Sequence, residues 1–163
     1  MNGTTAGLRH GKTALMVLTI AGGLLAASPA AAAHLREGTR VPVRMTSTIN
    51  SESSQAGDPV AFVVTSDVVV DGAVVIARGT PVAGWLLKVQ RRSWGFISHD
   101  AKLIFMFSHT TARNGTAIRL RSSNVDPMGG RVEIDRDRRH HGLQWAGVGD
   151  TFEAYVDGEY DLL

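Results

Sequence analysis

The sequence predicts an all-β protein, a single closed or partly closed β-barrel of about seven to nine short, mostly antiparallel strands. Several segments alternate apolar and polar residues with a period of two, as half-buried strands do. Asp-Gly and Asn-Gly pairs, which are typical of tight hairpin turns, lie between such segments. No substantial segment has apolar residues at helical spacing, so the crossover helices of a parallel sheet are not expected.

The first 33 residues differ in composition from the rest of the chain. Arg9 and Lys12 give this segment a basic start without acidic residues, and residues 13–27 form an apolar run. Residues 28–33 are Ser, Pro and four alanines. A basic start, a short apolar middle and a small-residue end are the three parts of a secretory signal peptide.

We therefore expect a signal peptide over residues 1–33 and a barrel domain over residues 34–163. Cleavage is expected after Ala33, with Ala30 as the second choice. The alternative is an uncleaved anchor, but the apolar run falls short of the about 20 residues that a spanning helix needs. The mature chain is then expected to have no membrane span and to be periplasmic or secreted.

Charge and cysteine content exclude several classes of protein. The 163-residue chain has a formal net charge of +2, with 17 basic and 15 acidic residues. Both surplus charges, Arg9 and Lys12, lie in the expected signal peptide, so the mature chain is formally neutral. A neutral domain lacks the basic surplus typical of nucleic-acid binding, and no nucleic-acid partner is expected. The absence of cysteine excludes disulfides, cysteine zinc sites and a thiol nucleophile.

The first expected strands lie near the start of the mature chain. In residues 41–46 every second residue is an apolar valine or methionine, and the same parity continues to Ile49. Residues 60–65 repeat the alternation with Val, Phe and Val on one face. Both segments are predicted to be strands with one buried face.

A hairpin and two more apolar segments follow. Asp71-Gly72 separates the apolar runs 68–70 and 73–76, and both turn residues tolerate the positive φ of a type I′ turn. Residues 82–89 and 103–107 are apolar on both faces. Such strands are expected at the centre of a sheet or between a barrel and a covering loop.

The last expected strands again have a single apolar face. Residues 117–121 follow the turn pair Asn114-Gly115 and alternate Ile and Leu with exposed-type residues. Residues 131–135 and 152–156 alternate in the same way, and Asp157-Gly158 marks a further turn. Short strands and turns thus fill the chain to its end, which favours a barrel or sandwich.

A basic and aromatic loop is the candidate recognition site. Arg91, Arg92, Trp94 and Phe96 lie close together in sequence. Guanidinium groups bind carboxylates and phosphates, and exposed aromatic rings stack on flat partners or sugars. These four residues are predicted to bind an envelope protein or glycan. The alternative is that Trp94 and Phe96 fold back and cap one end of the barrel.

A charged loop carries the alternative function, a small metal-assisted hydrolase. Asp137, His140 and His141 offer oxygen and nitrogen ligands for a divalent ion. The H-x-x-x-H and H-E-x-x-H spacings are missing, and adjacent histidines converge on one ion only from a loop. The chain also has no glycine-rich phosphate loop in the right context. We therefore expect a non-catalytic protein without metal or cofactor.

Several strand and turn motifs carry a family resemblance. They are Gly38-Thr-Arg-Val-Pro-Val-Arg44, Ile49-Asn-Ser51, Gly57-Asp58, Val68 to Gly72, Val75-Ile76-Ala-Arg-Gly79, Val82-Ala-Gly84, Asn114-Gly-Thr-Ala-Ile-Arg-Leu120 and Gly149-Asp-Thr-Phe152. In these motifs the chain resembles a group of small exported bacterial β-barrel proteins of unassigned function. More distantly, it resembles the C-terminal barrel of TrbI-type scaffold proteins of type IV secretion systems.

The resemblance implies a β-barrel in the cell envelope and no catalytic residues. Residues 135–141 depart from it, because they are charged where many of the small relatives have an apolar, glycine-rich stretch. A membrane contact through that segment is therefore not expected. Sequence and resemblance together predict an exported, non-catalytic envelope or periplasmic module with a binding or structural role.

Overall fold

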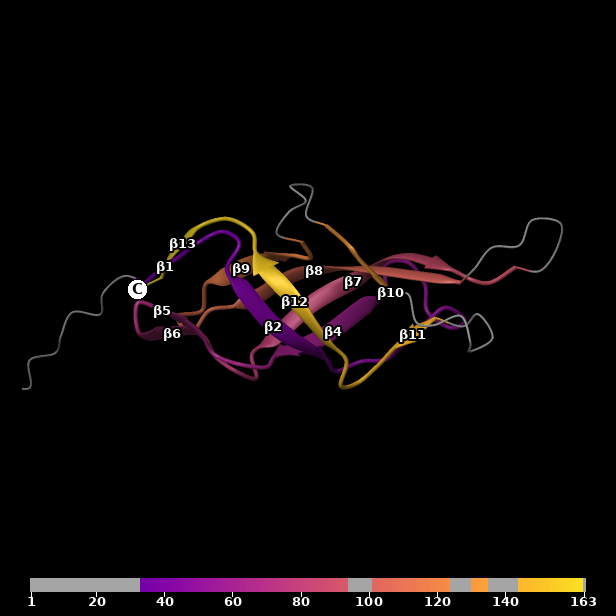
Figure 1. The fold of residues 1–163 in the computed structure, drawn as a ribbon, viewed down its shortest axis with the longest axis horizontal. Coiled ribbons are helices and arrows are strands. Elements are labelled where there is room, and N and C mark those ends of the chain that lie inside the picture. The colour runs from indigo at the N-terminus through magenta and orange to yellow at the C-terminus, as the bar shows by residue number, and fades with distance from the viewer. Residues whose placement is uncertain (1–32, 94–100, 124–129, 135–143, 163) are drawn as a thin grey trace, which may run out of the picture.

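The computed structural model describes residues 33–93, 101–123, 130–134 and 144–162, and these parts contain strands and no helix (Figure 1). The strands are β1 (Ala33–Leu35), β2 (Arg40–Met45), β3 (Ile49–Asn50), β4 (Pro59–Val64), β5 (Val68–Val70), β6 (Ala73–Ile76), β7 (Pro81–Gln90), β8 (Lys102–Thr111), β9 (Ala117–Arg121), β10 (Val132–Ile134), β11 (Trp145–Ala146), β12 (Thr151–Val156) and β13 (Tyr160–Leu162). The predicted all-β class is confirmed.

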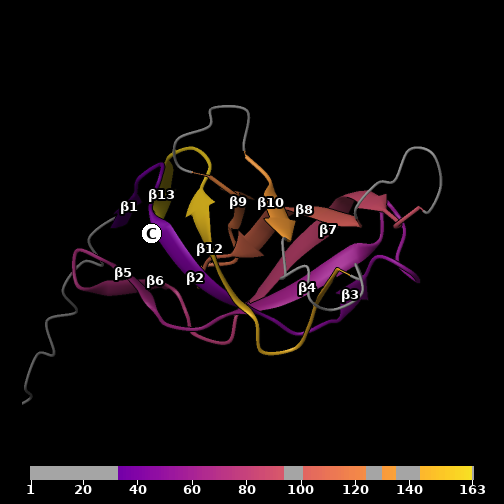
Figure 2. The same cartoon turned by 45° about the vertical axis from the view of Figure 1, so that its right-hand side comes forward.

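A seven-stranded antiparallel sheet forms the body of the protein, and six of its strands close into a barrel (Figure 2). Around the barrel the order is β8, β7, β4, β2, β12 and β9, and β9 pairs with β8 to complete the circle. The seventh strand, β10, pairs with β8 outside the circle. Closure removes the free edges that an open sheet of this size would have, and it confirms the predicted barrel.

The ten-residue strand β8 has two neighbours on one of its sides. Its first part, Leu103 to Phe105, pairs with β10, and its last part, His109 to Thr111, pairs with β9. Along the other side β7 accompanies β8 over nearly its whole length. Strand β4 pairs with β7 from Pro81 to Trp85, and Leu86 bonds to the backbone of Gly57 and Asp58 just before β4. The rest of the β7–β8 hairpin extends past the start of β4. We call residues 87–92 and 102–104 the arm.

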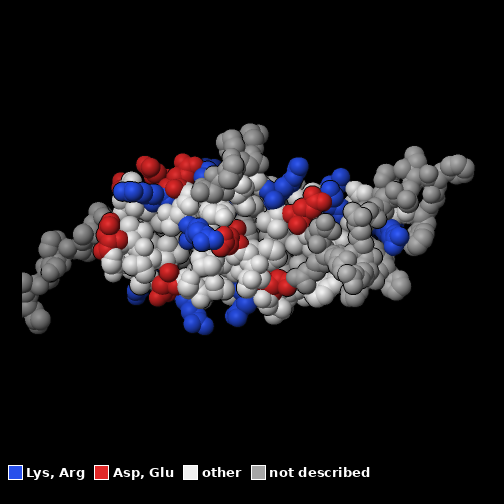
Figure 3. All heavy atoms as spheres, viewed as in Figure 1, with Lys and Arg blue, Asp and Glu red and all other residues white. Residues whose placement is uncertain are grey.

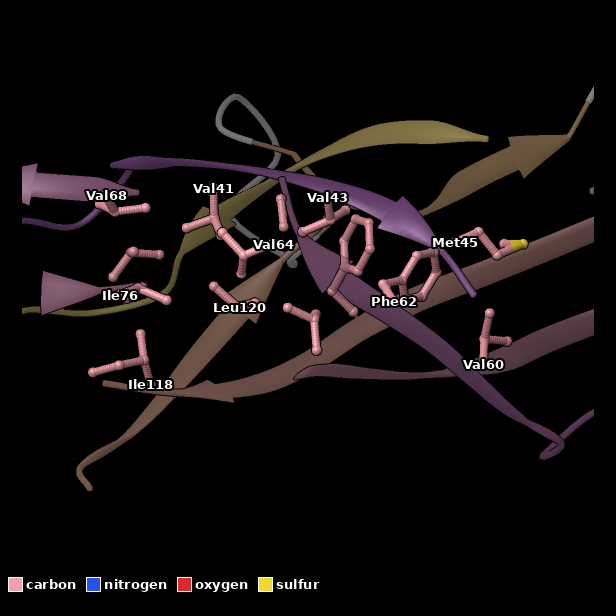
Figure 4. Close-up of a cluster of buried hydrophobic side chains, with 14 of the residues drawn as sticks. Val41, Val43, Met45, Val60, Phe62, Val64, Val68, Ile76, Ile118 and Leu120 are labelled. Carbon is pink, nitrogen blue, oxygen red and sulfur yellow. The ribbon is translucent and has the colours of Figure 1, made fainter. Parts of the chain in front are cut away.

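Interlocking phenylalanine rings fill the barrel. The ring centroid of Phe62 lies 5.3 Å from that of Phe105 and 4.9 Å from that of Phe107, and Phe152 lies 5.1 Å from Phe105. The tilted and edge-on geometries of these pairs are those that aromatic quadrupoles favour. Valine, isoleucine and leucine side chains of β2, β4 and β9 complete the core (Figure 4).

The predicted alternation accounts for which side chains enter this core. Val41, Val43 and Met45 of β2 are fully buried, while Arg44 between them is exposed. Strands β4 and β9 show the same pattern. Strand β2 ends at Met45 and Ile49 belongs to the separate strand β3, but the predicted alternation continues across the break, because Ile49 is buried and Thr46 and Thr48 are exposed.

The predicted hairpin at Asp71-Gly72 is confirmed. Val70 and Ala73 pair directly across a two-residue turn. Both turn residues have positive φ, 50° for Asp71 and 80° for Gly72, as a type I′ turn requires. This turn type matches the twist of the flanking strands, which is why Asp-Gly is favoured there.

The two segments predicted to be apolar and buried on both faces differ in outcome. Leu103, Ile104 and Phe105 of β8 are all buried, as expected. The prediction is wrong for β7, because Trp85 and Leu87 are 40% and 45% exposed. These two side chains lie on the outer face of the barrel wall and the arm, whereas the inner face buries alternate residues of the same strand.

Short two-stranded sheets extend the two ends of the barrel. The pairs β1–β13 and β5–β6 lie at one end, and β11 with its partner β3 lies toward the other, where the arm projects (Figure 1). Ala33, after which signal cleavage is predicted, is buried in β1 and pairs with Leu162. Residues 1–32 lie outside the described residues, and cleavage stays a prediction. None of the described residues belongs to a helix that could cross a membrane.

Candidate functional site

The tip of the arm carries the described half of the predicted recognition cluster. Arg91 and Arg92 directly follow β7, and both side chains are exposed. The Nε group of Arg91 donates a hydrogen bond to the carbonyl oxygen of Glu52 at 3.1 Å. This bond links the arm to the loop between β3 and β4. Trp94 and Phe96 lie outside the described residues, so the predicted set of four stays a prediction.

A shallow groove lies beside the arm tip. Its volume is about 550 Å³, and Ser54, Gln55, Ala56, Val89 and Arg91 line it. The groove therefore combines polar loop groups with one guanidinium, a combination suited to a polar or acidic segment of a partner.

Two exposed apolar side chains of β7 were not among the predicted site residues. Trp85 and Leu87 are two residues apart, so both side chains lie on the outer face of the same strand. Their exposure was not predicted, because the residues around them in the sequence are apolar without a break. One signal pointed to their exposure, because Val82, Gly84 and Leu86 already supply an inner face of matching parity.

A second, larger groove lies where β9 and β10 separate along β8, and we call it the fork groove. Its volume is about 720 Å³. Phe107 and Leu120 of the core line its floor, and Trp85, Met106, His109 and Arg119 are among the residues around it. Phe107 donates its backbone N–H to the hydroxyl of Ser122 at 3.3 Å, so a side chain replaces the strand pairing at this point. The fork groove is thus a product of β8 having two neighbours.

Ion pairs cross the strands beside the fork groove. Arg119 Nη2 lies 2.7 Å from Asp157 Oδ2, and Arg121 Nη1 lies 2.5 Å from Glu37 Oε1. Arg119 and Arg121 come from β9, whereas the two carboxylates come from segments that follow β12 and β1. In Figure 3 basic and acidic atoms are interspersed over the visible face rather than separated into large patches of one sign.

Arg40 and Glu153 form an ion pair in which each group shifts the pKa of the other. Arg40 on β2 donates from Nε and Nη2 to the two carboxylate oxygens of Glu153 on β12, and Tyr155 donates its hydroxyl to Glu153 at 3.2 Å. The hydrogen bond from Arg40 lowers the pKa of the Glu153 carboxyl, and the hydrogen bond to Glu153 raises the pKa of Arg40. The ion pair is exposed and links the neighbouring barrel strands β2 and β12, so we assign it a role in stability.

The residues of the predicted metal site, Asp137, His140 and His141, lie outside the described residues. Within the described ranges, no group of three or more His, Asp or Glu side chains is arranged to hold a metal ion. His34 in β1 instead bonds through Nδ1 to Asp161 Oδ1 at 2.7 Å and thereby joins β1 to β13. The hydrolase alternative has no described residue in its proposed site.

The fold defines the protein as a small closed antiparallel β-barrel with a projecting hairpin arm. No family model matches the chain, and no curated protein matches it.

Among the solved structures the chain is similar to ComB10 of the Com type IV secretion system of Helicobacter pylori, with 20% identity and a TM-score of 0.36. The match covers 56% of this chain and 45% of that chain, so the chain spans less than half the length of ComB10 in that structure. At this identity and TM-score, the match is not evidence for an activity or a partner of this chain.

Proposed function

We propose that this chain is an exported, non-catalytic β-barrel module of the cell envelope, periplasmic or secreted, and that its arm binds an envelope protein. The observation that carries the proposal is the arm itself. It projects past the β4 side of the barrel and exposes Leu87, Lys88, Arg91 and Arg92 together. An exposed apolar side chain among cationic ones is a combination that protein interfaces use.

The topology of the sheet favours the arm over the barrel wall as the surface that binds a partner. Strands inside the closed circle have both edges paired, so they offer a partner only side chains. Leu86 is still bonded through its backbone to Gly57 and Asp58, and from Leu87 on β7 has no strand beside it on the β4 side among the described residues. An extended segment that adds to β7 there would gain main-chain hydrogen bonds.

The charges of the arm tip indicate which kind of partner surface it binds. The arm tip carries Lys88, Arg91 and Arg92 within five residues, and Glu52 contributes its backbone carbonyl to the contact with Arg91. Guanidinium groups pair in two-pronged geometry with carboxylates. We therefore propose an acidic segment of an envelope protein as the partner of the arm.

A quantitative pull-down tests the binding role. Tagged wild-type chain, an Arg91→Glu/Arg92→Glu variant and an Arg113→Glu control are each incubated with envelope extract of the source organism. Arg113 is exposed and lies in the turn after β8, at the end opposite to the arm tip. The arm variant is expected to lose about tenfold or more of the captured protein, and the control to keep it. Equal capture by all three would contradict the proposal.

Export is tested separately, because it depends on residues 1–33 and not on the arm. Cell fractionation with intact-mass measurement is expected to find an extracytoplasmic chain that begins at His34. A Leu18→Arg/Leu24→Arg variant, which places charges in the apolar run, is expected to stay in the cytoplasm at full length. A full-length wild-type chain in the cytoplasm would contradict export and leave the binding test unaffected.

A further inference from the structure

We infer that the fork groove binds an acidic saccharide, with the Trp85 ring as the stacking surface for a sugar and Arg119 as the group that binds its carboxylate. This site is separate from the arm tip, and it uses none of the residues of the proposed protein contact.

The shape of the groove suits a small ligand. Its volume of about 720 Å³ falls within the range of ligand sites, about 300–1,000 Å³. It forms because the pairing of β8 with β10 ends at Phe105 and the pairing of β8 with β9 begins only at His109. Strand pairing therefore fixes the gap between the two contacts.

The apolar surface of the groove is a flat plate rather than a deep pocket. Trp85 is 40% exposed and pairs across the strands with the half-buried Met106. Phe107 and Leu120 on the floor are almost fully buried and add little contact area. A pyranose ring presents a flat face of C–H groups that packs on an indole in this way, whereas an alkyl chain needs an enclosed apolar channel.

Polar groups surround this plate. Arg119 donates from one terminal nitrogen to Asp157, and its side chain is 76% exposed. Its other guanidinium N–H groups have no partner among the described residues and can donate to a ligand. Ser108 and His109 are hydrogen-bonded to each other at 2.9 Å and line the same groove. Hydroxyl, imidazole and guanidinium groups around an aromatic face match the hydroxyl-rich edge of a sugar.

The exposed guanidinium of Arg119 favours an acidic sugar over a neutral one. Arg119 and Arg121 both line the groove, and each is paired with one carboxylate, Asp157 and Glu37 respectively. The Arg119 side chain is 76% exposed, against 11% for Arg121, so Arg119 is the cation that a sugar carboxylate can reach. A carboxylate gains a charge-assisted hydrogen bond there that a neutral sugar lacks. Arg119 and Asp157 form the pair that the ligand carboxylate would rearrange.

Calorimetric titration tests the site with digalacturonic acid as the probe and its dimethyl ester as the neutral counterpart. The acid is expected to bind about tenfold or more tightly than the ester, and added salt is expected to reduce the difference. Trp85→Ala and Arg119→Gln are each expected to weaken binding of the acid about fivefold or more. Trp85→Phe retains an aromatic plate and is expected to retain most of the binding.

Matched controls separate the site from general effects on the surface or the fold. Trp145→Ala removes another half-exposed indole, and Arg44→Gln removes another exposed guanidinium. Both are expected to bind the acid within about twofold of wild type, as is the Arg91→Glu/Arg92→Glu variant. Thermal melting of each variant confirms that it is folded, and binding is compared only among folded variants.

Three results would overturn the inference. One is equal affinity for the acid and the ester, because the charge argument would then fail. Another is unchanged affinity in folded Trp85→Ala and Trp85→Phe variants. The third is no heat of binding with millimolar acid while a capped tripeptide with a free C-terminal carboxylate binds, which would assign the groove to a peptide.

Discussion

Gly84 of β7 approaches the backbone of Met106 on β8 so closely that a β-carbon at Gly84 would lie 2.5 Å from the Met106 carbonyl oxygen. The same atom would lie 3.2 Å from the ring of Phe62. The register of β7 against β8 shifts at this point, between Ala83 and Gly84. The absence of a side chain at Gly84 therefore allows the two longest strands to bend around the core.

Gly84→Ala is expected to destabilise the barrel by about 1–3 kcal/mol, because the backbone oxygen that it meets has little freedom to move. Chemical denaturation measures the free energy of unfolding. Gly147→Ala is the control, because its new β-carbon would meet Thr48 and Trp145 at 3.4 Å, an ordinary contact distance. Equal stability of the two variants would contradict the close approach of β7 and β8.

Phe62→Ala is expected to cost about 3–5 kcal/mol, because it removes a buried ring and leaves a cavity. Phe62 contacts the rings of Phe105, Phe107 and Phe152, so its loss removes three ring contacts at once. Val69→Ala, at a 55% exposed position in β5, is expected to change stability by no more than about 0.5 kcal/mol. Denaturant titration of both variants measures the difference, and a Phe62→Ala cost as small as that of Val69→Ala would contradict the aromatic core.

Gly72→Ala is expected to lower the free energy of unfolding by about 1 kcal/mol or more, because alanine is strained at a φ of 80°. Asp71→Asn is expected to have little effect, because asparagine also tolerates the φ of 50° at that position. The comparison is made by thermal melting. A neutral Gly72→Ala variant would show that the turn is not type I′ in solution.

Glu153→Gln is expected to change how stability depends on pH. Arg40 lowers the pKa of the folded Glu153 carboxyl below its ordinary value. The carboxylate therefore stabilises the folded state above the unfolded pKa, and this contribution is lost as the pH falls through the lower, folded pKa. The wild type is expected to be the more stable chain at neutral pH, with the difference vanishing in acid and shrinking in high salt. A difference that stays constant from neutral to acidic pH would contradict a charge effect.

The sequence pattern predicted the local structure well, because alternation and turn chemistry act over a few residues. Val41, Val43 and Met45 enter the core as their spacing indicates, and Asp71-Gly72 forms the expected turn. The barrel was predictable as a class from the many short strands between turns. Its strand order was not, because β12 lies between β2 and β9 through contacts far apart in the chain.

The candidate sites were harder to predict for the same reason. The exposure of Trp85 depends on which strands cover the outer face of β7, and the sequence around it is apolar on both sides. The fork groove exists because β8 pairs with both β9 and β10, and no local pattern contains that information. Arg91 and Arg92 were predicted because clustered basic residues in a loop are visible in the sequence alone.

Site-specific crosslinking tests most directly whether the arm is the binding surface. A photoreactive residue is placed at Leu87 on the arm and, in a separate chain, at Val69 in β5 near the other end of the barrel; both positions are exposed. We expect one discrete crosslinked envelope protein from Leu87, its loss in the Arg91→Glu/Arg92→Glu background, and none from Val69. The same product from Val69, with none from Leu87, would contradict it.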